Sequence, residues 1–183
     1  MLDTFKLVAI DPGNNVGVAV YTISSIDMAV LAIESFTIVL SKQVTGLIDM
    51  SMERNIILES ACAKLSAIYN PNVVAMETAF LNSRFPKAVM QLSQYTSTVE
   101  RTFYKYNNFL KLYRYPPKYI KKYIGAGGNA DKNDMTVAVS NIPEISNMVD
   151  FNRVTEHEID AIAVGYITVA HLRQYPHELL CYA

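Results

Sequence analysis

The chain has little of what marks a secreted protein, a zinc protein or a membrane protein. It contains two cysteines, Cys62 and Cys181, which show neither the pairing pattern of a disulfide framework nor the CxxC spacing of a zinc site. The N-terminus lacks a charged region followed by a long apolar stretch, and the apolar runs are broken by Gly, Pro, Asn or Ser. We therefore expect a protein of a reducing, cytoplasmic compartment, without an export signal and without a membrane partner.

Charge is also scarce. Charged residues make up 18% of the 183 residues and hydrophobic residues 51%, which excludes a disordered or fibrous protein. One domain covering residues 1–183 with a sizeable core is expected. The net charge of −1 hides a segregation, because residues 84–132 hold ten basic residues and two acidic ones, interleaved with aromatic rings. This segment suits a nucleic-acid backbone, although a solvated basic helix with core-facing rings would show the same pattern.

Apolar periodicity and turn residues predict both strands and helices. The expected strands are 6–11, 17–24 and 28–40, as an antiparallel meander, followed later by 72–77 and 109–115. The expected helices are 51–69, 86–106, 117–124, 131–140 and 156–174, with a glycine-rich loop at 125–129 and irregular chain around Pro143. In the first helix the predicted core stripe consists of Ile56, Ile57, Ala61 and Leu65 to Ile68.

Acidic residues stand at the ends of three separate elements. Asp11 ends the apolar run 7–10 and opens a Pro-Gly-Asn-Asn turn, and Glu77 ends the apolar run 73–76. The third cluster, 155–160, opens the last helix. Oxygen ligands suit hard divalent cations that hold a phosphodiester, so their convergence would make a metal site. The alternatives are a turn-capping role for Asp11 and a basic partner for Glu77.

The last helix begins with a strong signal. Thr155 followed three residues later by Glu158 forms the sequence of a capping box. His157 and Asp160 are spaced i, i+3 and should project from one face of the first turn. A structural role for the histidine is the alternative. The residues Ile159, Ile162, Ala163, Tyr166 and Ile167 are expected to pack against the sheet.

Four segments together resemble the RuvC-like Holliday junction resolvases of the RNase H-like nuclease superfamily. In family order they are Asp-Pro-Gly continuing to Gly-Val-Ala at 11–19, Met-Glu-Thr-Ala-Phe at 76–80, the basic stretch with glycines at 117–132, and Glu-His-Glu-Ile-Asp-Ala-Ile-Ala at 156–163. The resemblance implies an α/β, RNase H-like fold. Its five-stranded mixed sheet would have three antiparallel strands first and helices on both faces.

The resemblance also implies an activity. The expected function is a crossover junction endodeoxyribonuclease of a bacterial or phage-infected bacterial cell, a homodimer that resolves four-way DNA junctions by paired nicks. Two Mg²⁺ ions per active site, with Mn²⁺ as a substitute, would drive hydrolysis of the phosphodiester. The long Met/Ile/Tyr-rich stretches and the insertion-like 133–134 region depart from the family. Phage-encoded relatives with similar departures also cut forks and other branched DNA, so the resemblance implies cleavage of such substrates as well.

The family motifs assign roles to particular residues. Asp11 would bridge two cations, Glu77 would bind one, and Asp160 with His157 would complete the site and orient or deprotonate the attacking water. Lys132 would stabilise charge in the transition state, Phe80 would stack on a base at the junction core, and further DNA contacts would come from Lys118, Lys121 and Lys122. Glu156 and Glu158 remain outside the expected catalytic set.

Three other activities compete with this assignment. The actin-like ATPases open with a similar acidic turn, but a chain of 183 residues has no room for the second domain that they need. A non-catalytic protein that binds branched DNA would keep the basic segment and lose the acids. An RNase H-like nuclease acting on structured RNA would share the whole site and would differ only in substrate.

Overall fold

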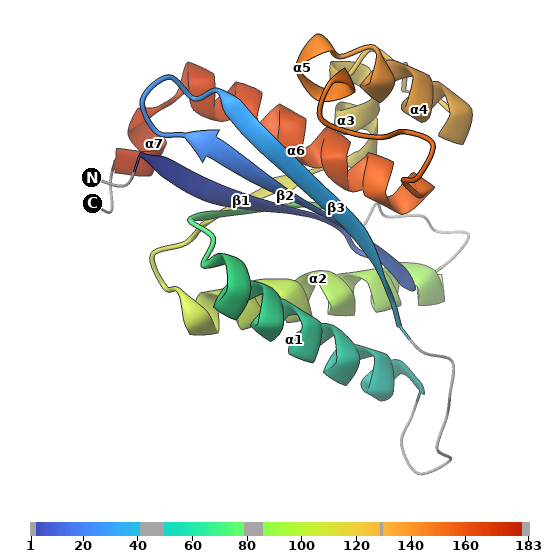
Figure 1. Ribbon diagram of the computed structural model, residues 1–183. Coiled ribbons are helices and arrows are strands. Elements are labelled where there is room, and N and C mark those ends of the chain that lie inside the picture. The colour runs from blue at the N-terminus through green and yellow to red at the C-terminus, as the bar shows by residue number, and fades with distance from the viewer. Residues whose placement is uncertain (1–2, 41–49, 79–85, 129, 181–183) are drawn as a thin grey trace.

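The computed structural model describes residues 3–40, 50–78, 86–128 and 130–180, which form a five-stranded mixed sheet between two layers of helices (Figure 1). The strands are β1 (Thr4–Asp11), β2 (Asn15–Ser24), β3 (Val30–Val39), β4 (Val73–Glu77) and β5 (Lys111–Tyr115). Their order across the sheet is β3-β2-β1-β4-β5. The first three strands are antiparallel, whereas β4 runs parallel to β1 and β5 runs parallel to β4. This arrangement confirms the predicted fold class.

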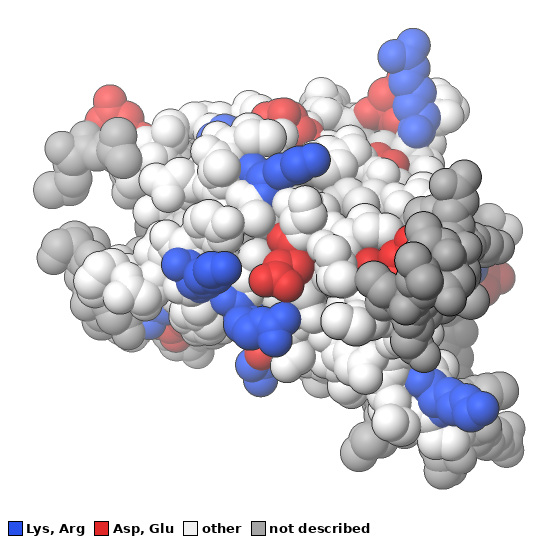
Figure 2. Space-filling view, turned by 90° about the horizontal axis from the view of Figure 1, so that it is seen from below, with Lys and Arg blue, Asp and Glu red and all other residues white. Residues whose placement is uncertain are grey.

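Helices cover both faces of the sheet (Figure 1). They are α1 (Met50–Tyr69), α2 (Pro86–Tyr106), α3 (Pro117–Tyr123), α4 (Lys132–Ser140), α5 (Pro143–Ser146), α6 (Glu156–Gln174) and α7 (His177–Leu180). Helices α1 and α2 form one layer, and α6 lies across the other face beside α3, α4 and α5. Seen from the side of α1 and α2, the surface is mostly uncharged, with acidic and basic side chains intermixed (Figure 2).

Strand β1 is buried on both faces, and its alternate residues enter two different cores. Leu7 and Ala9 pack on the α6 side, while Val8 and Ile10 pack on the side of α1 and α2. A strand covered on both faces loses the polar alternation of a half-exposed strand, which explains the continuous apolar run. Asp11 is therefore the first polar side chain at the end of a fully covered strand.

The structure corrects several predicted details. Strand β3 begins at Val30 rather than at residue 28, because Met28 has a positive φ of 58° that an extended strand does not allow. The region around Pro143 forms the short helix α5, with the proline at its start, and α7 was not predicted. In α1 the buried apolar residues are Leu58, Cys62 and the predicted Leu65, while Ile56 is 49% exposed. Both stripes have helical spacing, so periodicity alone did not choose between them.

None of the helices in the described ranges is long and apolar enough to span a membrane. Cys62 is buried and free, whereas Cys181 lies outside the described residues. The expected core stripe of α6 is confirmed for Ile159, Ile162 and Ile167, each at most 3% exposed.

Candidate active site

The register of two parallel strands brings Asp11 and Glu77 to the same edge of the sheet. Ile10 of β1 pairs with Met76 of β4, so the next residue along each strand is one of the two acids. Parallel strands end at a common edge, and β1 and β4 are direct neighbours. Both carboxylates are half-buried, as expected for side chains that leave a covered sheet at its rim.

The start of α6 reaches this edge because β2 has a glycine where the helix crosses it. Gly17 pairs with Asp11 across β1 and β2. A Cβ atom at Gly17 would lie 1.9 Å from the carbonyl oxygen of His157 and 2.3 Å from its carbonyl carbon, so only glycine allows this approach. In the resulting position, His157 Nδ1 lies 3.0 Å from Asp11 Oδ2.

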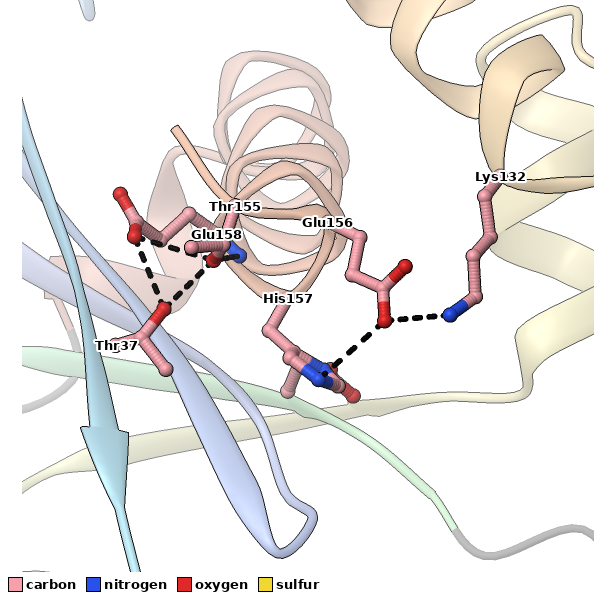
Figure 3. A network of polar contacts seen from close by, with 7 residues as sticks. Thr37, Lys132, Thr155, Glu156, His157 and Glu158 are labelled. Atoms are coloured by element: carbon pink, nitrogen blue, oxygen red, sulfur yellow. Dashed lines mark hydrogen bonds and ion pairs between the residues drawn. The ribbon is translucent and has the colours of Figure 1, made fainter. Parts of the chain in front are cut away.

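Glu158 attaches the same helix start to β3. The carboxylate of this buried residue accepts hydrogen bonds from Ser35 Oγ at 2.8 Å and from Thr37 Oγ1 at 2.9 Å. Thr155 is the N-cap as predicted, and its Oγ1 accepts a hydrogen bond from the Glu158 backbone N–H at 3.3 Å. The Glu158 side chain is turned toward the hydroxyl groups of Thr37 and Thr155 (Figure 3), rather than back to the N-cap backbone as a complete capping box requires.

These contacts fix the orientation of α6 at its functional end. Sequence reasoning missed Gly17, Ser35 and Thr37 as positioning residues. The signal for the two hydroxyls was present, because they alternate on one face of β3 within a largely apolar strand. The close approach at Gly17 had no local signal, since it depends on a helix more than a hundred residues away.

The carboxylates at this edge act on one another electrostatically. Burial, together with the charges of Asp11 and Asp160, raises the pKa of Glu77 to about 8. Burial and the charge of Asp11 also raise the pKa of Asp160 to about 6. The charge of Lys121 opposes both shifts. The fold therefore gathers three carboxyl groups from β1, β4 and α6 into one region of low solvation, where their mutual repulsion is not offset by a single lysine.

His157 joins this group through Asp11. The hydrogen bond to Asp11 raises the pKa of His157, and the charges of Asp11, Glu156 and Asp160 act in the same direction against the effect of burial. The imidazole is thus held by one acid through Nδ1, while Nε2 lies 3.6 Å from Glu156 Oε1. A histidine fixed at one nitrogen has its second nitrogen oriented for ligand binding or proton transfer.

The predicted lysines differ in burial and in their partners. Lys121 is half-buried and donates a hydrogen bond from Nζ to the carbonyl oxygen of Ala130 at 2.7 Å. Lys132 is exposed at the rim, where its Nζ lies 2.5 Å from Glu156 Oε1 (Figure 3). This contact lowers the pKa of Glu156. Glu156 therefore lies between Lys132 and His157, a place that sequence reasoning left open.

A cavity of about 260 Å³ opens beside this group, and its lining includes Lys121, Lys132, Glu156 and Asp160. With Asp131, which also lines it, two basic and three acidic residues border one space at the start of α6. On α3, Lys118 and Lys122 are exposed and Lys121 is the half-buried one. The predicted stacking residue Phe80 lies outside the described residues.

The donor set fits hard divalent cations. Asp11, Glu77 and Asp160 offer carboxylate oxygens, and His157 offers an imidazole nitrogen. Within the described parts of the chain, no three His, Cys, Asp or Glu side chains stand close enough to hold an ion in their present rotamers. The pKa values of Glu77 and Asp160 are raised first by burial and then by the charge of Asp11, and a bound cation would favour the ionised form of both groups.

Solved structures of junction resolvases share this fold. Thermus thermophilus RuvC in complex with a Holliday junction substrate gives a TM-score of 0.70 at 18% identity, covering 93% of this chain and 96% of that chain. The Thermus thermophilus RuvC structure gives a TM-score of 0.66 at 19% identity, over 94% of this chain and 96% of that one. The yeast mitochondrial Holliday junction resolvase Ydc2 gives a TM-score of 0.58 at 18% identity, over 96% and 80%.

At these identities the three structures establish the common fold alone. A search of curated proteins found no match to this chain. Family membership follows from the sequence itself. Residues 7–171 match the family described as Crossover junction endodeoxyribonuclease RuvC, so the chain belongs to this family of hydrolases that act on DNA.

Proposed function

We propose that this chain resolves four-way DNA junctions, and cuts other branched DNA, by paired metal-dependent nicks made by a homodimer. Nucleases of the family require divalent cations. The observation that carries the proposal is the meeting of Asp11, Glu77 and Asp160 at one edge of the sheet, where burial and neighbouring carboxylates raise the pKa values of Glu77 and Asp160. Such a group of acids destabilises the fold unless bound cations offset its negative charge.

Asp11, Glu77, Asp160 and His157 are the proposed metal ligands. When bound, two Mg²⁺ ions, or Mn²⁺ in their place, would activate the attacking water and stabilise the charge that develops on the phosphodiester. Asp11 is the proposed bridging ligand because it alone contacts His157 while also acting on both other carboxylates. The single charge difference between Asp and Asn makes Asp11→Asn a direct test of this role.

Two lysines are proposed to hold the scissile strand. The charge of Lys121 acts on the acids directly, since it lowers the pKa of both Glu77 and Asp160. Lys132 reaches the same cavity from α4 and is the proposed stabiliser of transition-state charge. Its ammonium group is held by Glu156, so a phosphate has to replace that carboxylate as its partner. Lys118 and Lys122 are proposed to contact the backbone further out.

His157 has two candidate roles that one substitution separates. If the imidazole only replaces a carboxylate ligand, His157→Asp keeps the nicking activity. If it takes a proton from the attacking water, His157→Asp abolishes nicking even where the metal still binds. The hydrogen bond to Asp11 suits either role, because it fixes the ring in both cases.

The layer of α1 and α2 is the proposed dimer interface. The two helices run parallel, as shown by the hydrogen bonds from Ser51 to Gln94 and from Thr98 to Asn55. Their first halves expose apolar side chains, with Met52 at 59%, Ile56 at 49% and Met90 at 65% exposed. Ile56→Glu and Met90→Glu should each shift the protein to a monomer in light scattering, whereas a wild-type monomer would contradict the homodimer.

The experiment for the whole proposal is cleavage of a labelled synthetic four-way junction in Mg²⁺ and in EDTA. We expect nicking by the wild type in Mg²⁺ alone. Asp11→Asn and Glu77→Gln should abolish it and leave junction binding nearly intact, because distributed phosphate contacts supply most of the affinity. On a supercoiled cruciform plasmid, paired nicking gives linear product, and single nicking gives open circles.

The same assay separates the alternatives. A wild-type protein that binds the junction but never nicks it would be a binding protein. Preferential cutting of structured RNA in a matched comparison would assign the site to an RNA nuclease. Either outcome contradicts the proposal, and normal cutting by the Asp11→Asn variant would place the active site elsewhere.

A further inference from the structure

A column of tyrosine rings runs along the edge of the sheet, from β5 to α3. Tyr113 and Tyr115 stack with centroids 6.5 Å apart and planes 7° apart, and Tyr115 stacks on Tyr119 at 5.9 Å and 9°. Tyr119 is followed by Tyr123 at 6.0 Å with planes tilted by 36°. We name these four residues the tyrosine column. Its members come from the outermost strand and the helix that follows it.

The inner end of the column is anchored and the outer end is open. Tyr115 is 9% exposed, and the Tyr113 hydroxyl lies 2.5 Å from a carboxylate oxygen of Glu178. Tyr119 and Tyr123 are each 47% exposed, although both are large aromatic residues. The buried rings therefore hold the exposed ones in place, so little conformational freedom is lost when another flat group stacks on them.

Positive charge accompanies the column. Residues 111–123 contain five basic residues and no acidic one. On α3, Lys118 and Lys122 are spaced i, i+4, as are Tyr119 and Tyr123, so the two lysines lie beside the two rings. Lys121 and Ile120 occupy the remaining sides of the helix, toward the acids and the core respectively. The surface of α3 thus passes from the proposed active site over two lysines to two exposed rings.

We propose that Tyr119 and Tyr123, with Lys118 and Lys122, bind unpaired single-stranded DNA next to the active site. Alternating rings and ammonium groups suit a strand whose bases are free to stack, because stacking needs an exposed base face that paired arms do not offer. The lysines neutralise the phosphates of the same strand. The inference rests on the proposed function for its biological substrate, a branched DNA with a single-stranded segment. Its binding test needs no catalysis.

The test is fluorescence anisotropy of labelled oligo(dT) with the full chain in EDTA. The double variant Tyr119→Leu/Tyr123→Leu should bind at least about tenfold more weakly, and Tyr119→Phe/Tyr123→Phe should bind as the wild type does. Lys118→Ala/Lys122→Ala should lower the slope of log K against log salt by about 1.4, from two phosphate contacts on a single strand.

Matched controls come from another helix. Tyr104 and Tyr106 on α2 are 44% and 55% exposed and lie outside the column, so Tyr104→Leu/Tyr106→Leu should bind oligo(dT) normally. If Tyr104→Leu/Tyr106→Leu weakened oligo(dT) binding as much as Tyr119→Leu/Tyr123→Leu, the proposal would be overturned. Wild-type affinity in Tyr119→Leu/Tyr123→Leu would overturn it as well. Binding of oligo(U) without binding of oligo(dT) would overturn it too.

The outcomes also separate this inference from the proposed function. A wild-type chain that binds oligo(dT) through the column but nicks no DNA would refute the nuclease proposal and support the column as a binding surface. If instead the wild type nicks four-way junctions in Mg²⁺ and Tyr119→Leu/Tyr123→Leu keeps its oligo(dT) affinity, the nuclease proposal is supported and the tyrosine column is refuted as a binding surface.

Discussion

Gly17→Ala should disable the active site without touching a proposed ligand. The new Cβ would lie 1.9 Å from the carbonyl oxygen of His157, whereas contacts under 3.0 Å essentially never occur. The start of α6 must therefore move away from the sheet by at least about 1 Å. The Cβ is fixed directly to a strand paired on both sides, and the carbonyl belongs to the first turn of a helix, so neither can rotate aside.

The displacement carries two measurable costs. Overpacking of this kind destabilises a fold by about 1–3 kcal/mol. A shift of about 1 Å in a catalytic geometry lowers the rate by about a hundredfold, and here it moves both His157 and Asp160 relative to Asp11. We expect the nicking rate on a four-way junction to fall by at least that factor, at a temperature where circular dichroism shows the variant folded. Metal affinity measured by calorimetry should fall with it.

Val18→Ala is the matched control. Val18 is the next residue in the same strand, is fully buried, and packs on the opposite face with the core next to α1 and α2. Loss of its two methyl groups should cost about 1–3 kcal/mol as well, yet leave the approach of α6 unchanged. Wild-type nicking by folded Gly17→Ala, or an equal loss in Val18→Ala, would refute the argument.

Three further predictions concern stability and its dependence on pH. In EDTA, the free energy of unfolding should fall as the pH rises through about 6 and about 8, because Asp160 and Glu77 have raised pKa values in the folded state and bind more protons there than in the unfolded chain. Glu77→Gln should remove the upper part of this fall in thermal melts. A wild-type stability that does not change with pH would contradict the prediction. Glu158→Gln should lower the free energy of unfolding by about 1–3 kcal/mol in urea titrations and weaken metal binding, because it perturbs the charge-assisted hydrogen bonds to β3. Unchanged metal affinity would show that these hydrogen bonds do not position the site. Tyr21→Phe should lower the free energy of unfolding by about 1 kcal/mol, because the hydrogen bond to the Ile162 carbonyl is lost, and it should leave the nicking rate unchanged. A variant that nicks more slowly would indicate that this contact also positions α6.

The sheet could be predicted because its strands carry strong local signals. Strands β1 and β4 are continuous apolar runs that end in an acid, and the pair of prolines at 116–117 marks the end of β5. The predicted core stripe of α1 was right at Leu65 and wrong at Ile56 and Ile68, because the helix has apolar residues on several sides. Its buried residues Leu58, Cys62 and Leu65 were selected by the sheet that the helix packs on, which periodicity does not describe.

The sequence could indicate the acidic residues of the candidate site, but not the residues that hold them in position. Asp11, Glu77 and Asp160 each stand at an element end, so the sequence alone indicated that they could meet. The contacts that fix them depend on pairs of residues far apart in the chain. Glu158 reaches Ser35 over 123 positions, and no local pattern predicts such a contact.

The site combines a rigid frame with unrelieved charge. The helix start is held at Gly17 by backbone contact, at Asp11 through His157, and at β3 through Glu158, so contacts within the chain define its orientation. The gathered carboxylates oppose the fold at neutral pH, and Glu77 with a pKa of about 8 retains its proton there. A divalent cation held by the proposed ligands would displace that proton, and it would stabilise the protein by offsetting the negative charge. Because contacts within the chain already place the start of α6, the proposed site would use its affinity for metal to offset charge rather than to order the chain.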